Sequence, residues 1–306
     1  MKRAFLMIAV LAAASFVAAQ ANSTSTAPAG QAQTGTQSSG SQSNVNAVPN
    51  SPMPAPVPHS KGAPQAKTQE EFKAYQEVVA KSDTTEMEQA ADAFAQKYPN
   101  SDLRVVLYNN LMNTYRNGGA TDRAIAAGRK SLAIDPTDPV PNVMVALSLA
   151  QTTRDTDLDK GDRLTEASRD AQRAIDNIDT GMTIPPNTPP ERVQAAKNSI
   201  LQMAYETEGT VAMSKKDFPT AETAFRKGID VNKAQPDGVL YLRLAIALDN
   251  DKKYPEAMEA TENAIKYNQA GSEAQNLANQ EKARLQKLVG NATPATPATS
   301  PAPPAQ

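Results

Sequence analysis

Apolar residues recur three and four positions apart through most of the chain, a spacing that places them on one face of an α-helix. The clearest case is 105–138, where two such stretches flank a turn that contains glycine. Large residues on the first stretch and small ones on the second allow two helices to pack closely as a hairpin. The packing positions are Tyr108, Leu111, Met112 and Tyr115 on the first helix and Ala124, Gly128 and Ser131 on the second.

Similar hairpins are predicted on both sides of this stretch. Thr68 begins a Thr-Gln-Glu-Glu sequence that is typical of a helix start, because Thr and a Glu three residues later can cap the first amides. The last helix has apolar residues on one face and polar residues elsewhere, as expected for a helix that shields the end of a helical array. The predicted pairs cover about 68–97, 105–138, 139–179, 191–228 and 241–268, and the last helix about 272–288.

The composition favours an all-α fold. Tryptophan is absent and aromatic residues make up 5% of the 306 residues, which suits closely packed helices better than a β-sandwich. The formal net charge is −2, and removing Lys2 and Arg3 makes it −4. Because there is no basic surplus, no nucleic acid is expected as a partner.

Several classes of chemistry lack the residues that they need. The chain has no cysteine, which excludes disulfides and thiolate chemistry, and its one histidine, His59, lies in a proline-rich stretch. Histidine-based zinc sites and most general-base catalysis are therefore not expected. The common phosphate-binding, dinucleotide-binding and hydrolase motifs are absent, so we predict a protein that is not an enzyme and needs no cofactor.

Residues 1–21 have the form of a secretory signal peptide, with Lys2 and Arg3, an apolar run from Ala4 to Ala19 and small residues at the end. The run is shorter than the ~20 residues that a membrane-spanning helix needs. We therefore expect export to the periplasm or cell envelope, with an uncleaved N-terminal anchor as the alternative. No integral membrane span is expected in the mature chain.

Two further segments are poor in apolar residues. Residues 22–67 are rich in Ser, Gln and Pro, and residues 290–306 are rich in Ala, Thr and Pro. Such compositions bury too little apolar surface to offset the entropy of the chain, so both segments are expected to be disordered. The folded part is thereby predicted to cover residues 68–289.

The order of large and small packing residues in 105–138 resembles the tetratricopeptide repeat, whose pattern is 34 residues long. Pro99 and Pro136 lie 37 residues apart, and Ala221 and Ala257 lie 36 apart, which is close to that period. The resemblance implies an α-solenoid of about five hairpins with a C-terminal capping helix. It also implies a non-catalytic scaffold of the bacterial cell envelope that binds a protein or peptide on its concave surface.

Three positions depart from the family pattern. Met112 stands where the family prefers Gly, and Gly128 stands where it prefers Phe or Tyr. Glu208 occupies a position where the family has Leu, which weakens the match in the fourth pair.

In this family the concave surface is lined by residues of the first helix of each pair that do not take part in packing. Asparagine suits such a surface, because its amide can both donate to and accept from a peptide backbone. Carried over by position, the resemblance assigns partner binding to Asn109, Asn110, Asn113, Arg116, Met144, Leu147, Glu206, Thr210, Met213, Arg243, Ile246 and Asp249.

Two alternatives remain open from the sequence. A carboxylate-based envelope enzyme or enzyme subunit would need two acids in one cleft, such as Glu206 and Asp249. A calcium-sensitive adaptor would use the insertion at 153–166, which partly matches a calcium-binding loop although Lys160 stands where that loop needs Gly. The weak candidate calcium ligands are Asp155, Asp157, Asp159 and Glu166.

Overall fold

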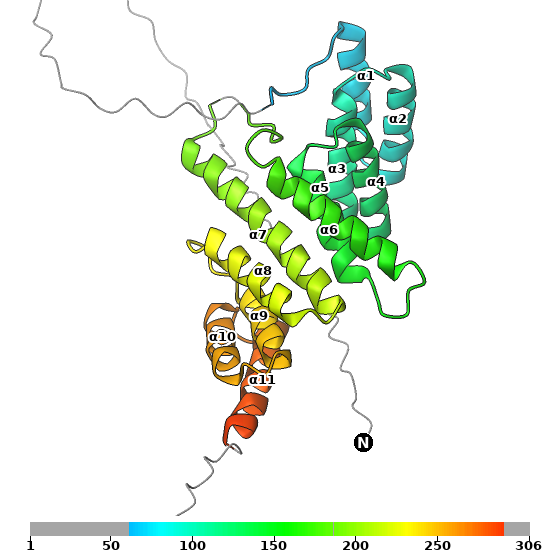
Figure 1. The fold of residues 1–306 in the computed structure, drawn as a ribbon. Helices are drawn as coiled ribbons and strands as arrows, with labels where there is room; N and C mark the ends of the chain where they lie inside the picture. Colours follow the sequence, from blue (N-terminus) through cyan, green and yellow to red (C-terminus); the bar gives the residue numbers. More distant parts are fainter. Residues whose placement is uncertain (1–60, 186, 291–306) are drawn as a thin grey trace, which may run out of the picture. The chain divides into compact units, whose positions relative to one another are not determined.

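The computed structural model describes residues 61–185 and 187–290, with side chains up to Leu288. The signal segment 1–21, the linker as far as residue 60 and the tail from residue 291 lie outside the described residues. The helices (Figure 1) are α1 (Gln69–Val79), α2 (Thr84–Lys97), α3 (Leu103–Asn117), α4 (Thr121–Ile134), α5 (Pro139–Thr152), α6 (Lys160–Asp176), α7 (Pro190–Ser214), α8 (Phe218–Val231), α9 (Gly238–Asn250), α10 (Tyr254–Tyr267) and α11 (Glu273–Gly290). Among the described residues, no helix is long and apolar enough to cross a lipid bilayer.

Side chains at the helix starts explain where several helices begin. Thr68 accepts a hydrogen bond from the backbone N–H of Glu71 at 3.1 Å, and Asp83 accepts one from that of Glu86 at 2.8 Å. The Glu71 carboxylate accepts the backbone N–H of Lys67 at 2.7 Å. Hydrogen bonds from Ser101 and from the backbone of Lys67 and Thr68 help to hold the pKa of Glu71 below its usual range, as expected at a capped helix start. Prolines in the first turn cost no intrahelical hydrogen bond and occur at Pro139, Pro190, Pro219 and Pro255.

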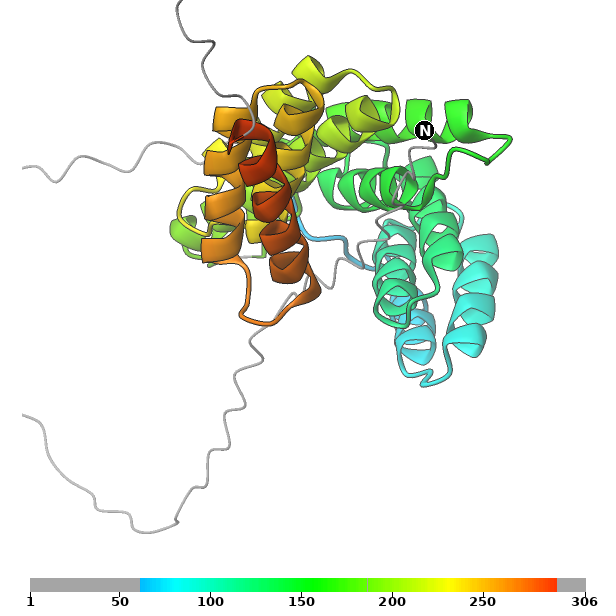
Figure 2. The same ribbon diagram turned by 90° about the horizontal axis from the view of Figure 1, so that it is seen from below.

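The helices pack as successive hairpins. Each pair α1–α2, α3–α4, α5–α6, α7–α8 and α9–α10 is in contact, and the second helix of each pair also contacts the helix that follows it. The last helix, α11, packs on both α9 and α10 (Figure 2). The structure thus confirms the prediction of an all-α solenoid with five hairpins and a C-terminal capping helix.

The core of the second pair explains two departures from the repeat pattern. A Cβ built on Gly128 would lie 2.4 Å from Cγ2 of Val145 and 3.0 Å from Sδ of Met112. In the fourth pair the glycine is on the first helix and the large residue is on the second. A Cβ on Gly209 of α7 would lie 2.3 Å from the ring of Phe225 of α8. The large and the small residue have therefore exchanged helices in the second pair, and the two departures compensate each other.

The third departure, Glu208, is accommodated by a polar neighbour. The hydroxyl of Ser168 on α6 donates to both carboxylate oxygens of Glu208 on α7, at 3.1 and 2.9 Å. Burial nevertheless raises the pKa of Glu208, and burial is the largest influence on it. The residue is thus a half-buried acid held between two helices.

The fourth pair begins with the longest helix of the described residues. Helix α7 has 25 residues and contacts α5, α6 and α8. In Figure 1 it runs between the hairpins formed by α1–α6 and the helices α8–α11. Through these contacts α7 joins the first three hairpins to the last two.

Candidate functional site

The residues assigned to partner binding on α7 and α9 meet a side chain of α5. The Gln151 amide on α5 donates to Oε1 of Glu206 on α7 at 3.4 Å. Nε of Arg243 on α9 lies 3.3 Å from the same carboxylate oxygen, and its Nη1 donates to Oγ1 of Thr210 at 3.3 Å. We name the surface of α3, α5, α7 and α9 that carries the predicted binding residues the inner face.

The contact between Glu206 and Arg243 joins α7 to α9 and so stabilises the fold. Only 8% of Glu206 is exposed, and burial raises the pKa of its carboxyl group, an effect that the charge of Arg243 partly offsets. Nε of Arg243 is buried and makes no hydrogen bond of good geometry. Its contact with Glu206 at 3.3 Å is therefore an ion pair and not a hydrogen bond. Gln151, which the sequence analysis did not single out, lies one turn beyond Leu147 on the same helix.

Asp249 is paired with the capping helix. Its carboxylate forms an ion pair with the guanidinium of Arg284 on α11, which also contacts Glu281 at 2.9 Å. Glu206 and Asp249 are therefore held by two different arginines. The pairing of these two acids in one cleft, on which the enzyme alternative depended, does not occur in the structure.

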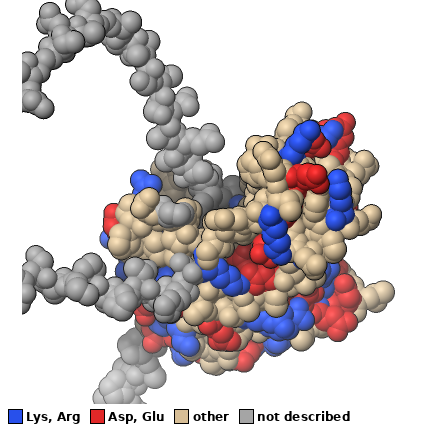
Figure 3. All heavy atoms as spheres, turned by 90° about the horizontal axis from the view of Figure 1, so that it is seen from above, with Lys and Arg blue, Asp and Glu red and all other residues tan. Residues whose placement is uncertain are grey.

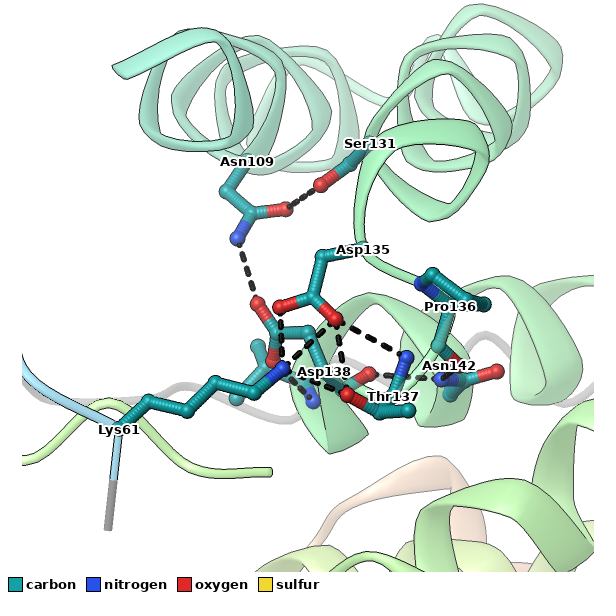
Figure 4. Close-up of polar contacts among 9 residues, drawn as sticks. Lys61, Asn109, Ser131, Asp135, Pro136, Thr137, Asp138 and Asn142 are labelled. Carbon is teal, nitrogen blue, oxygen red and sulfur yellow. Dashed lines mark hydrogen bonds and ion pairs between the residues drawn. The ribbon is translucent and has the colours of Figure 1, made fainter. Parts of the chain in front are cut away.

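The structure gives Asn109 an internal role instead of a free position on the inner face. Its Oδ1 accepts from the Ser131 hydroxyl of α4 at 2.7 Å, and its Nδ2 donates to the Asp138 carboxylate at 3.1 Å (Figure 4). Asp138 also accepts the N–H of Val140 and so caps α5. Asn109 thus ties α3, α4 and the start of α5 together, so both ends of its amide are engaged within the fold. Partner binding by Asn109 stays a prediction.

The N-terminal segment before α1 reaches the same turn. The ammonium group of Lys61 donates to Asp135 at 2.5 to 2.6 Å and to the hydroxyl of Thr137 at 2.5 Å (Figure 4). The backbone N–H of Lys61 donates to the carbonyl of Met182 at 3.1 Å. Lys61, which lies within the stretch 22–67 that the composition assigned to the linker, therefore contacts the solenoid, because a lysine can pair with an acidic turn.

Three polar residues of α3 remain on the inner face without such roles. Asn110 is exposed and Asn113 is half-buried, and neither side chain makes a hydrogen bond within 61–185 and 187–290. Arg116 is half-buried, and its Nε has no hydrogen-bond partner among the described residues. Each of these residues is three positions from the next, so successive members are neighbours in a row that runs obliquely around the helix.

The remaining predicted residues are apolar. Met144 is 9% exposed and belongs to the core, whereas Leu147, Met213 and Ile246 are half-buried. They leave part of an apolar surface open on α5, α7 and α9.

The insertion does not assemble the weak calcium site. Asp155 pairs with Lys160 at 2.8 Å, and Asp157 accepts the backbone N–H of Arg154 at 2.8 Å. Nε and Nη2 of Arg129 donate to the two carboxylate oxygens of Glu166, at 2.8 and 2.6 Å. Among the described residues, no group of three or more acidic or histidine side chains could hold a metal ion.

An open hollow of about 920 Å³ lies beside the insertion. Its walls come from the α3–α4 turn, including Gly119 and Arg123, and from the insertion itself, including Arg154 and Asp159.

Figure 3 shows Lys and Arg side chains interspersed with Asp and Glu side chains over the described part of the face that it draws. That face carries no extended area of one charge sign.

The hairpin order and the size-matched packing positions decide the fold type. The fold is that of a tetratricopeptide-repeat solenoid. No family model and no curated protein sequence matches the chain.

Several solved structures are similar in fold. A crystal structure of MamA protein has 18% identity and a TM-score of 0.45, and the match covers 70% of this chain and 92% of that one. The assembly chaperone of RpL4 has 13% identity and a TM-score of 0.37, with 73% and 98% covered. A tetratricopeptide repeat protein from Parabacteroides merdae has 13% identity and a TM-score of 0.34, with 72% and 86% covered. These similarities concern the fold alone.

Proposed function

We propose that the chain is an exported, non-catalytic scaffold that binds a protein or peptide partner on its inner face. The observation that carries the proposal is the set Asn110, Asn113 and Arg116, which presents polar groups that the fold does not use. Half-buried polar groups such as those of Asn113 and Arg116 normally have partners, so their lack of any among the described residues favours a ligand.

The chemistry of this row suits a peptide. Each asparagine amide can donate to and accept from a backbone amide, and arginine can hold a carbonyl or carboxylate oxygen. The half-buried side chains of Leu147, Met213 and Ile246 offer an apolar surface for an anchor residue of the partner. The expected ligand is therefore an extended or helical segment with polar groups near α3 and an apolar residue towards α7.

The cell envelope is the proposed location. It is supported by the signal-like pattern of residues 1–21 and by the absence of cysteine from the whole chain. The absence of enzyme activity remains part of the proposal, and it is supported by the separate ion pairs of Glu206 and Asp249.

Crosslinking in intact cells, followed by identification of the attached proteins, tests the proposal. A variant with Asn110→Ala, Asn113→Ala and Arg116→Ala should capture its partner about one hundred times less, because each lost hydrogen bond contributes about 1 kcal/mol. A control variant with Gln89→Ala and Gln96→Ala, two exposed residues of α2, should capture it normally. Equal capture by the two variants would contradict the proposed face.

A further inference from the structure

The segment that precedes α1 contacts two connections between hairpins through one residue. We name residues 61–68 the strap, and in Figure 1 it runs from beside the α6–α7 connection to α1. The backbone N–H of Lys61 donates to the carbonyl of Met182 in that connection. Its ammonium group donates to the Asp135 carboxylate and to the Thr137 hydroxyl in the α4–α5 turn. The first residue of the strap thus holds two successive connections of the solenoid.

The other end of the strap contacts a third connection. The ammonium group of Lys67 donates to the carbonyl of Asn100 in the α2–α3 turn at 2.6 Å, and Ala66 packs against the core. The strap then ends at Thr68, which caps α1. It therefore follows the connections between the first and second, the second and third, and the third and fourth hairpins.

These contacts cross a joint that divides the proposed binding site. The second hairpin meets the third mainly through packing of α4 on α5. The polar row, with Asn113 and Arg116, belongs to α3 on one side of this joint, and the apolar Leu147 belongs to α5 on the other. Because the hairpins of a linear array contact only their neighbours, a segment that contacts several of them restricts how they rotate against each other.

We propose that the strap is a clasp that fixes the second hairpin to the third and so sets the spacing between the polar and apolar parts of the inner face. The clasp is closed while the ammonium group of Lys61 is bound to Asp135. When this ion pair breaks, the strap releases the α4–α5 turn, and the hairpins on its two sides can move relative to each other. The effect of the clasp on partner binding rests on the proposed function, whereas the clasp itself does not.

The sequence and the exposure of the ion pair fit a clasp that opens and closes. Lys61 is the first residue after Arg3 that is charged at pH 7, so no other charge in the preceding stretch competes for Asp135. Charge-assisted hydrogen bonds are strong enough to favour the closed form at low ionic strength. The side chains of Lys61 and Asp135 are 36% and 25% exposed, so dissolved ions reach the pair and salt weakens it.

The distance between two spin labels tests the clasp in the mature chain. The chain has no cysteine, so Gln89→Cys on α2 and Gln172→Cys on α6, both at exposed positions, attach labels to the first and third hairpins only. Pulsed electron paramagnetic resonance should give one narrow distance distribution at low salt. Adding Lys61→Ala should raise the population outside that range about tenfold, because the hydrogen bonds to the Asp135 carboxylate are lost.

Matched variants separate the clasp from other effects of losing a lysine. Lys61→Arg keeps the charge and should keep the narrow distribution, as should Lys73→Ala, which alters an exposed lysine of α1. Raising sodium chloride from about 50 mM to about 1 M should broaden the distribution of the native sequence but not that of Lys61→Ala. Circular dichroism checks that each variant keeps its helices. A distribution that Lys61→Ala leaves unchanged, or that Lys73→Ala changes equally, would overturn the clasp.

Capture of the partner separates this inference from the proposed function. In the crosslinking experiment in intact cells, Lys61→Ala should reduce capture severalfold, because the polar and apolar contacts no longer keep their spacing. A changed distance distribution in Lys61→Ala, together with no capture by the native chain, would contradict the proposed function and leave the clasp standing. Normal capture by Lys61→Ala despite a changed distribution would overturn the regulatory role of the clasp.

Discussion

At the scale of single residues, the second hairpin depends on the match between Met112 and Gly128. Nothing larger than hydrogen fits at Gly128, because Val145 and Met112 occupy the space of a Cβ. The methionine on the first helix fills the volume that a large residue on the second helix would otherwise take. One position therefore constrains the other, which a position-by-position comparison with the repeat pattern cannot reveal.

Gly128→Ala should destabilise the protein by about 1 to 3 kcal/mol, because the added methyl group overpacks the core. The matched control is Gly161→Ala on α6, where a Cβ has nothing within 4 Å and alanine is the better helix former. Urea denaturation of both variants measures the difference. Equal stability of the two would show that the packing at Gly128 can relax.

Two neighbouring asparagines of α3 should behave in opposite ways. Asn109→Ala removes the hydrogen bonds to Ser131 and Asp138 and leaves a buried carboxylate without its amide partner. The expected loss is about 1 to 3 kcal/mol of stability. Asn110→Ala alters an exposed residue and should change stability by no more than about 0.5 kcal/mol. Thermal unfolding of both variants separates the structural residue from the proposed binding residue.

At the scale of elements, acidic residues lie between neighbouring helices in two kinds of environment. An ion-paired acid and a buried acid change the stability of the fold with pH in opposite directions. The hydrogen bonds from Arg129 on α4 hold the pKa of Glu166 on α6 below its usual range. Burial between α6 and α7 raises the pKa of Glu208. Glu166 therefore contributes stability above its unfolded pKa that is lost as pH falls through the lower folded value. The ionised carboxylate of Glu208 destabilises the folded state. This destabilisation is lost as pH falls through the raised pKa that Glu208 has in the folded state.

Glu166→Gln should lower stability at pH 7, and its difference from the native protein should shrink as pH falls through the lowered pKa of Glu166. Glu208→Gln should raise stability at pH 7 or leave it unchanged, because it removes the cost of a buried charge but keeps a hydrogen-bond acceptor for Ser168. Urea denaturation at a series of pH values measures both. The same pH dependence in the two variants would show that the environments of these acids are alike.

At the scale of the whole molecule, the hairpins form a linear array in which each pair contacts mainly its neighbours. The polar contacts of the inner face act across this array, because Glu206 and Arg243 join the fourth pair to the fifth, and Asp249 and Arg284 join the fifth to the capping helix. Residues assigned to a ligand by position are thereby used to hold successive repeats together.

Calcium should not change the stability of the molecule. Asp155 is engaged by Lys160, Asp157 by the backbone of Arg154 and Glu166 by Arg129, and an ion would have to break these contacts. Because a ligand that binds only the folded state raises the melting temperature, the prediction is an unchanged melting temperature with millimolar calcium. A rise of several degrees that a chelator reverses would restore the calcium alternative.

Periodicity and caps were sufficient to predict the helices, because both are local properties of the sequence. The spacing of Tyr108, Leu111 and Tyr115 defined one packed face, and Thr68 marked a helix start. Local pattern could not predict that Asn109 bonds to Asp138, since the two residues are 29 positions apart and meet only when α3 packs beside the turn before α5. Lys61 reaches Asp135 in the same way.

The all-α class, the hairpins and the capping helix could be predicted from the sequence, because the hydrophobic period and the turn residues act within short stretches of chain. Which polar residues of the inner face are engaged depends on how the helices pack. Glu206, Arg243 and Asn109 have partners on other helices, whereas Asn110 and Asn113 have none among the described residues. The physical reason is that a polar side chain is satisfied by whichever group packing brings within hydrogen-bond distance, and packing joins residues that are far apart in the sequence.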